Sequence, residues 1–341
     1  MTTQQDSSIG IGKEPTFGAL TTPDHFYEFL IETFNWVPTF TMNNGQRVGR
    51  ILQRVDRRVL TKEEATGELD VEGFSKGLGF LFQAALGTAT STLIAGSAYQ
   101  QLITPTASDY LNSYTIQKGI PPLGGGAASP QTYAGMVCSG FTMTIGNTAI
   151  PTFKFPWVGK SMDVSTALTA PSYITNNQVW SFKDGSIQIG GAVTVPGANT
   201  LATGGTAVAD IIDASLVWSN ALDGGGFNLG GNGQRTRKPA TGDRVATGSL
   251  TAEFDSTVLL AAWRAQTPLS LVLNFISTVA PISGAVFPQL QITCPAILLN
   301  GEMPRANSGK VIVQTIPFDV MDNGVAGSSL YVAIVTAETA I

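Results

Sequence analysis

Short runs of β-branched and aromatic residues, separated by Gly, Pro, Asn and Asp, recur along most of the chain. Such runs are typical of strands, and the residues between them are typical of turns. The chain is therefore predicted to be mostly β. We expect strands at Phe26–Trp36, Tyr133–Ile145, Val179–Ile189, Ile211–Trp218, Leu269–Ile276, Leu290–Leu299, Lys310–Phe318 and Leu330–Thr336.

One segment shows two periodicities in succession. Leu69 and Val71 alternate with Glu68, Asp70 and Glu72, which is the period of two of a half-exposed strand. The apolar residues that follow recur at helical spacing, and Gly87 is placed to end that helix. These apolar residues are Phe74, Leu78, Leu81, Phe82 and Ala85.

This strand and helix occur twice. Ala65–Glu72 (Ala-Thr-Gly-Glu-Leu-Asp-Val-Glu) recurs as Ala246–Glu253 (Ala-Thr-Gly-Ser-Leu-Thr-Ala-Glu), and upstream Asn44–Arg47 (Asn-Gly-Gln-Arg) recurs as Asn232–Arg235. Two matched blocks in the same order indicate a duplicated domain. In the second copy, Asp255 or Ser256 is placed to cap a helix. Its apolar stripe is Val258, Leu259, Ala262 and Trp263.

A short helix against an antiparallel sheet or sandwich, twice over, predicts an α+β, mostly β fold. The alternative is two unrelated β domains, which would make the repeat a coincidence. The length of 341 residues agrees with about two domains.

The composition points toward an assembly protein. Only 13% of the residues are charged, whereas about 25% is usual in soluble proteins. Because interface cores are depleted in charge, we expect neighbouring subunits to cover much of the surface. A net charge of −5 argues against general nucleic-acid binding. We recognise no signal peptide and no membrane span.

Residues that carry catalysis or bind metals are scarce. His25 is the single histidine, and we expect it to begin a strand rather than to serve a nucleophile. No cysteines or histidines have zinc-site spacing, and Gly159-Lys160-Ser161 lacks the first glycine of a P-loop. The glycine runs at 124–126, 224–226 and 230–233 resemble flexible loops rather than a dinucleotide motif. We expect no enzyme, no cofactor and no metal.

The two cysteines, Cys138 and Cys294, allow one disulfide or two reduced thiols. Their distance in the sequence does not decide between these states.

Ten of the nineteen basic residues lie in two segments that precede the two Ala-Thr-Gly strands. We hypothesise that these segments contact a neighbouring subunit or ring. Their acidic partners would then include some of Asp24, Glu28, Glu32, Glu63 and Glu64. Solvated loops and nucleic-acid contact are the alternatives. The candidate contact residues are Arg47, Arg50, Arg54, Arg57, Arg58, Arg235, Arg237 and Lys238.

Glu68, Asp70 and Glu72 point to one face of their strand, and like charges so close require that this face be wet. It is either an outer surface or an acidic wall that repels phosphates. In the second copy, Ser249, Thr251 and Glu253 occupy the matching positions.

Two further segments have no obvious place in the repeat. Residues 1–20 have little apolar content, and we expect an arm that orders against a neighbour. The stretch from about 105 to 130 has no counterpart in the second copy, and we expect an inserted surface or inter-ring loop.

The opening segment Gly10–Ala19 (Gly-Ile-Gly-Lys-Glu-Pro-Thr-Phe-Gly-Ala), together with Pro23, resembles the N-terminus of phage tail tube proteins. The Ala65 strand followed by the Phe74–Gly87 helix is similar to that family as well. The resemblance implies β-sandwich domains with a flanking helix, stacked into rings whose inner strands form a barrel around a DNA-conducting lumen.

Most members of that family have one domain per chain in hexameric rings, whereas two domains are expected here, at 21–170 and 171–341. Three chains would then close a pseudo-hexameric ring, with a homohexamer as the alternative. The implied partners are the tape measure, the terminator and the baseplate hub, with genomic DNA passing unbound. The implied location is the virion tail, assembled in the host cytoplasm.

Three other functions remain open from the sequence. A trimeric tail-completion or hub protein would also use duplicated tube domains. A capsid or decoration protein would form spherical assemblies, and a secreted carbohydrate-binding or carbohydrate-cleaving β protein belongs to a different class.

Overall fold

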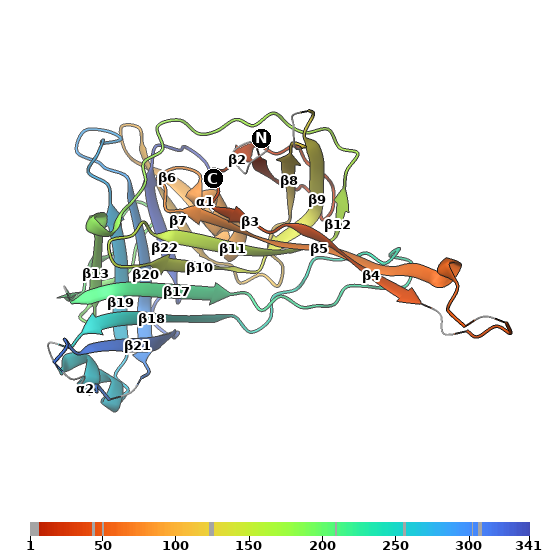
Figure 1. Ribbon diagram of the computed structural model, residues 1–341. Coiled ribbons are helices and arrows are strands. Elements are labelled where there is room, and N and C mark those ends of the chain that lie inside the picture. The colour runs from red at the N-terminus through yellow and green to blue at the C-terminus, as the bar shows by residue number, and fades with distance from the viewer. Residues whose placement is uncertain are drawn as a thin grey trace.

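The computed structural model describes residues 7–42, 45–49, 51–122, 126–208, 210–254, 257–301, 303–305 and 309–341. The described chain forms a β-rich body from which one long hairpin projects (Figure 1). Two α-helices are found in these ranges, together with the short 3-10 turns Val55–Arg57 and Phe182–Asp184. The predicted α+β, mostly β fold is confirmed.

One antiparallel sheet, which we call the long-strand sheet, runs across the body. It is a continuous series of hydrogen-bonded neighbours, so strands from both halves of the chain form one surface. From one edge to the other, the series is β4 (Asn35–Met42), β5 (Arg58–Glu72), β11 (Thr152–Gly159), β10 (Gly140–Ile145), β17 (Ile211–Ser219), β18 (Val245–Glu253) and β21 (Val313–Val320).

A second antiparallel sheet packs behind the first, and in Figure 1 its strands β13, β20 and β22 run steeply across the strands of the long-strand sheet. The two sheets are continuous where Ile297–Leu299 pair with the end of β21. The pairing order is β6 (Gly87–Ala95), β7 (Ala98–Pro105), β22 (Tyr331–Thr336), β20 (Gln289–Leu299), β19 (Leu269–Ile276), β13 (Gly185–Ile189) and β16 (Ala207–Val208).

The N-terminal strand belongs to a third group of strands within the chain. β1 (Ser8–Lys13) pairs along its whole length with β8 (Tyr114–Ile120), and Ile9 and Ile11 are fully buried. The group is completed by β2 (His25–Phe26), β9 (Ser129–Cys138) and β12 (Ser161–Asp163). Short pairs elsewhere are β3 (Ile31–Glu32) with β5, and β14 (Val193–Thr194) with β15 (Thr203–Gly204).

Two expectations are corrected by this third group. Residues 8–13 are a core strand of their own chain rather than part of an arm that orders against a neighbour, because the alternate isoleucines Ile9 and Ile11 are buried in the interior. Residues 1–6 of the predicted arm lie outside the described residues. The stretch 105–130 is not an inserted loop, since it contains the buried strand β8. Gly124 and Gly125 lie outside the described residues.

The repeat folds alike in both copies, as β5–α1–β6 and as β18–α2–β19. Helix α1 (Leu78–Leu86) is almost wholly buried, and Gly87, at φ 97°, ends it as expected. Helix α2 (Val258–Ala265) buries no residue fully, although Leu259, Ala262 and Trp263 pack against the core. The cap expected at Asp255 or Ser256 lies outside the described residues.

The predicted strands match the structure best in the second half, where Leu269–Ile276 is β19 itself. Phe26–Trp36 is instead mostly irregular, because it follows β5 through isolated bonds such as Leu30 N–H to Asp70 O. Tyr133–Ile145 is divided between β9 and β10, and Val179–Ile189 is a strand only from Gly185. Strands β6, β7, β8 and β11 were not predicted. Strands β10 and β17 pair across residue 170, and so do β7 and β22, so the sheets show no break there. The proposed division into two domains near residue 170 stays a prediction.

Candidate interaction surfaces

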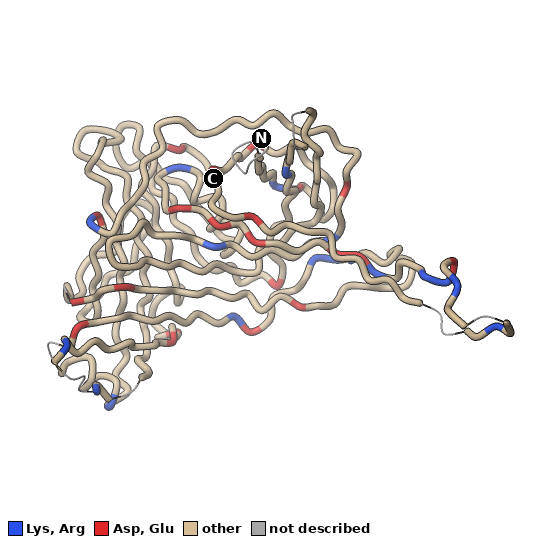
Figure 2. Tube along the Cα trace, viewed as in Figure 1, with Lys and Arg blue, Asp and Glu red and all other residues tan. Residues whose placement is uncertain are grey.

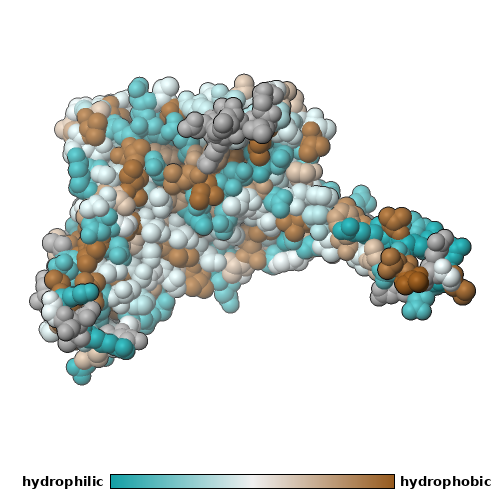
Figure 3. Space-filling model, in the orientation of Figure 1, coloured by the Kyte–Doolittle hydropathy of each residue, from teal (hydrophilic) through white to brown (hydrophobic). Residues whose placement is uncertain are grey.

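A two-stranded arm is the most exposed element of the molecule. We define the arm as residues 39–60, the far part of the β4–β5 hairpin, in which every described residue is exposed. It carries apolar side chains as well as charges, including Phe40 at 44% exposure and Ile51 at 101%. Figure 3 shows apolar patches on the projecting part, and Figure 2 shows its arginines. Apolar side chains gathered in water are typical of an interaction site, so the arm has the character of an unpartnered contact surface.

The basic residues predicted for contact behave differently along the arm. Arg54 pairs with Asp56 on the same turn, and the Arg58 guanidinium lies 4.6 Å from the centroid of the Phe40 ring. Arg47 and Arg57 are exposed and form no ion pair among the described residues. Arg50 lies outside the described residues. Among the described residues of the arm, Arg47 and Arg57 are therefore the guanidinium groups with neither an ion pair nor a ring contact.

The second basic segment lies on the loop between β17 and β18, residues 220–244, and that loop folds back onto the base of the arm. Gly233 O accepts the Glu63 N–H at 2.9 Å, and Arg235 Nη2 lies 3.2 Å from Glu64 Oε2. Two cations lie over the Phe227 ring, with Lys62 Nζ at 4.2 Å and the Arg235 guanidinium carbon at 4.7 Å from its centroid. We call this contact the clasp.

Burial makes the clasp a structural contact of the chain. Arg235 is 2% exposed, and it also donates to the carbonyl of Gly225. This burial does not fit the prediction that Arg235 contacts a neighbouring subunit. Sequence reasoning identified Arg235 through the repeated Asn-Gly-Gln-Arg, but no pattern pointed to Phe227, which needs the loop conformation to reach Lys62.

Arg237 and Lys238 are also held within the chain. Arg237 Nη2 donates to Asp223 Oδ2 at 2.6 Å, and this hydrogen bond lowers the pKa of Asp223. Lys238 Nζ donates to Leu111 O at 3.1 Å, and burial lowers its pKa. Whether either residue also touches a neighbour stays a prediction.

One face of the long-strand sheet is packed and the other is wet and acidic. Leu69 and Val71 are fully buried, while Glu68, Asp70 and Glu72 lie half-exposed on the opposite face. Lys154 on β11 lies between two of these acids, 3.2 Å from Glu68 Oε2 and 3.8 Å from Asp70 Oδ2. Partial burial raises the pKa of Asp70 despite this lysine.

The acidic face continues into the second half of the sheet through β17, β18 and β21. Strand alternation and register place Asp213, Glu253 and Asp319 on the same side as Ser249 and Thr251, whose neighbours Leu250 and Ala252 are buried. Asp213 and Asp319 were not identified from the sequence, because the register between strands decides their side.

The residues considered for catalysis have structural settings. His25 begins β2 as expected, stacks on the Phe80 ring at 3.9 Å and contacts Asp24 at 2.7 Å. Cys138 and Cys294 are both free and buried, and burial raises the pKa of each thiol to about 12. Within the described ranges, no three metal-binding side chains cluster closely enough to hold an ion. Neither helix of those ranges is long and apolar enough to span a bilayer.

A family model described as phage tail tube protein matches residues 4–320, which is nearly the whole chain. No curated protein matches the chain.

Proposed function

The chain belongs to the phage tail tube protein family, and from this premise we propose that its copies self-assemble into stacked rings, which form the hollow tail tube through which DNA passes. The family assigns the chain a structural role in the tail of the virion. The ring, the lumen and the passage of DNA are the parts that we infer from the arm, the long-strand sheet and its acidic face.

The long-strand sheet is the observation that carries the proposal. It crosses the molecule without interruption, and its first strand, β4, has no partner on its outer edge among the described residues. Unpaired, partly apolar edges are normally avoided in soluble proteins because they invite strand pairing. Pairing of β4 with a strand of another copy would cover this exposed edge.

The repeat supports three chains per ring. β5–α1–β6 and β18–α2–β19 are two versions of one unit, and the pairing of β10 with β17 joins the two units within a chain. If every joint in the ring resembles this internal one, six units close the ring and three chains provide them. A homohexamer is the alternative.

The acidic face is the surface that we assign to the lumen, with Glu68, Asp70, Glu72 and Glu253 among its charged residues. A wall of carboxylates repels DNA phosphates, so the genome would slide without binding. We further propose that the tape measure, terminator and baseplate hub proteins are the partners at the ends of the tube, and that assembly takes place in the host cytoplasm.

Negative-stain electron microscopy of the purified chain, over a range of protein and salt concentrations, tests the proposal. We expect hollow tubes or rings whose end-on averages show three-fold symmetry and six similar lobes. Six chains per ring by native mass measurement would replace the trimer with the hexamer. Monomers at every concentration and salt level would contradict spontaneous assembly.

A further inference from the structure

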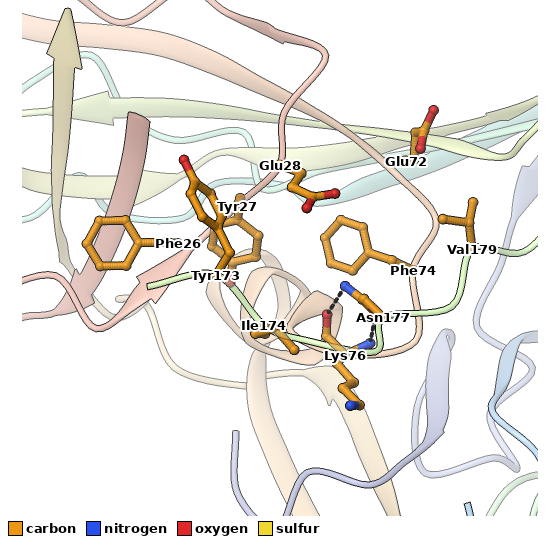
Figure 4. Close-up of a pocket in the computed structure, with 10 residues that line it drawn as sticks. All are labelled: Phe26, Tyr27, Glu28, Glu72, Phe74, Lys76, Tyr173, Ile174, Asn177 and Val179. Carbon is orange, nitrogen blue, oxygen red and sulfur yellow. Dashed lines mark hydrogen bonds between the residues drawn. The ribbon is translucent and has the colours of Figure 1, made fainter. Parts of the chain in front are cut away.

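A small pocket of about 60 Å³, open to solvent, lies where the end of β5 meets the segment after β2 and the linker that precedes β13. Its walls include the rings of Phe26, Phe74 and Tyr173, and its carboxylates are Glu28 and Glu72. In Figure 4 the Glu28 carboxylate lies between the tyrosine rings and the Phe74 ring. Tyr173 is 42% exposed, so an aromatic surface remains open at the mouth.

The pocket has an unbalanced negative charge. Neither Glu28 nor Glu72 forms an ion pair among the described residues. Lys76 also lines the pocket, but its Nζ donates to Thr175 O at 2.9 Å and forms no ion pair with either carboxylate, and two carboxylates with one ammonium leave a net negative charge. Aromatic faces beside a carboxylate are the setting that a guanidinium group prefers, because stacking and charge-assisted hydrogen bonds act together.

The molecule already contains one arginine in this setting. Within the clasp, Arg235 lies over the Phe227 ring at 4.7 Å and pairs with Glu64 at 3.2 Å. Arg235 ends the tetrapeptide Asn-Gly-Gln-Arg in the second copy of the repeat, and Arg47 ends the same tetrapeptide in the first copy. Arg47 is exposed on the arm, with neither a ring nor a carboxylate beside it in the described contacts.

We propose that Arg47 of one copy binds in the Glu28 pocket of the next copy. This inference rests on the proposed tube assembly, to which it adds the receptor site for the arm. In the second copy of the repeat, Arg235 finds its carboxylate and its aromatic ring within the chain. In the first copy, Arg47 finds them in another copy of the chain.

The positions of arm and pocket require a second copy. β5 is a single strand of 15 residues, with the arm joined at Arg58 and the pocket at Glu72. At a rise of about 3.3 Å per residue, these ends are about 45 Å apart, and Arg47 lies beyond the Arg58 end. Copies arranged head to tail along β5 would bring each arm to the pocket of its neighbour. A head-to-tail contact between copies related by translation along β5 does not close on itself and therefore builds a filament.

Disulfide trapping between two different variants tests the contact directly. The full-length variants Arg47→Cys and Glu28→Cys are mixed under the conditions in which the wild type assembles, and oxidised. We expect a linked dimer at about ten times the yield of the control pair Arg47→Cys with Val325→Cys, because a contact raises the local thiol concentration. Val325 is 89% exposed and does not line the pocket. The native cysteines are buried and remain unreactive.

Charge exchange provides an independent measurement. Glu28→Arg and Arg47→Glu are each expected to reduce the sedimenting fraction about tenfold, and the double variant is expected to restore it to within about twofold of the wild type. Equal trapping in test and control pairs, or an unaltered sedimenting fraction in Glu28→Arg, would overturn the pocket while tubes still form. If the wild type forms neither rings nor tubes, the proposed function fails first and this inference fails with it.

Discussion

The glycine of the repeated Ala-Thr-Gly has a packing reason in both copies. A Cβ on Gly67 would lie 2.5 Å from the backbone of Phe34, and a Cβ on Gly248 would lie 2.3 Å from the Phe318 ring and 2.4 Å from Ser215 O. At both positions a phenylalanine lies across the strand, where no larger residue fits. The repeated sequence thus records a repeated contact rather than a turn.

Gly67→Ala and Gly248→Ala should each lower the free energy of unfolding by about 1–3 kcal/mol, because the added methyl group overpacks a site with backbone on one side. Urea denaturation measures this change. Gly146→Ala is the matched control, since its Cβ would meet nothing closer than 3.8 Å. Wild-type stability in both test variants would show that the phenylalanines can move aside.

Equivalent elements of the repeat have different surroundings. Phe82 of α1 is fully buried and meets the rings of Phe141 and Phe153 edge-on, at 5.1 and 5.4 Å. Trp263, its counterpart in α2, is only partly buried. Phe80 of α1 contacts His25 of β2 and Tyr114 of β8, both in the third group of strands, and no such ring contact is found on α2 among the described residues. Similar amphipathic patterns thus produced one core helix and one surface helix.

The arm is the other element whose role depends on a neighbour. The double variant Arg54→Glu with Arg57→Glu reverses two charges of the arm. It should reduce tube assembly, because these charges would no longer attract acidic groups on a neighbouring copy. Turbidity and electron microscopy follow the assembly. The control reverses two cations elsewhere, in Lys183→Glu with Arg264→Glu. Unchanged assembly in the arm variant would show that these arm charges do not contribute.

At the scale of the whole molecule, the two halves of the chain share one interior. Strands β10 and β17 join the long-strand sheet across the midpoint, and β7 and β22 join the second sheet. Titratable groups are buried in both halves, with Cys138 in the first half and Cys294 in the second, each fully enclosed. Ionisation of either thiol would therefore place an unpaired charge in the shared hydrophobic core and destabilise the fold.

The stability of the fold should consequently depend on pH in the alkaline range. Burial raises the pKa of Cys138 and Cys294 from 9 to about 12, and burial also raises the pKa values of Tyr27, Tyr114 and Tyr133. The folded chain holds these protons more tightly than the unfolded chain. This contribution is complete below about pH 9 and is lost as the pH rises toward 12.

Urea denaturation at pH 7, 9 and 10.5 should give similar stabilities at the first two values and a lower one at the third. In the double variant Cys138→Ala with Cys294→Ala, two titrating groups are absent, so the decline should be shallower. An equal free energy of unfolding at pH 7 and 10.5 would contradict the burial of these groups.

The sequence by itself determined the local features of this protein. Period-two alternation identified the Ala65–Glu72 strand and the buried side of its residues, and helical spacing identified the stripe from Leu78 to Ala85. The duplicated blocks identified strand followed by helix in both copies. These features depend on neighbours within a few residues along the chain, and a single sequence contains that information.

Tertiary structure alone decided which surfaces were left free. Burial of β1 and β8 came from their pairing with each other, about a hundred residues apart, so neither was recognisable as core beforehand. The settings of Arg235 and Arg47 were also decided by tertiary structure. Both residues end the same tetrapeptide, but Arg235 lies in the clasp and Arg47 lies on the arm. Which side chains meet depends on strand register and loop path, and both are set by contacts between distant residues.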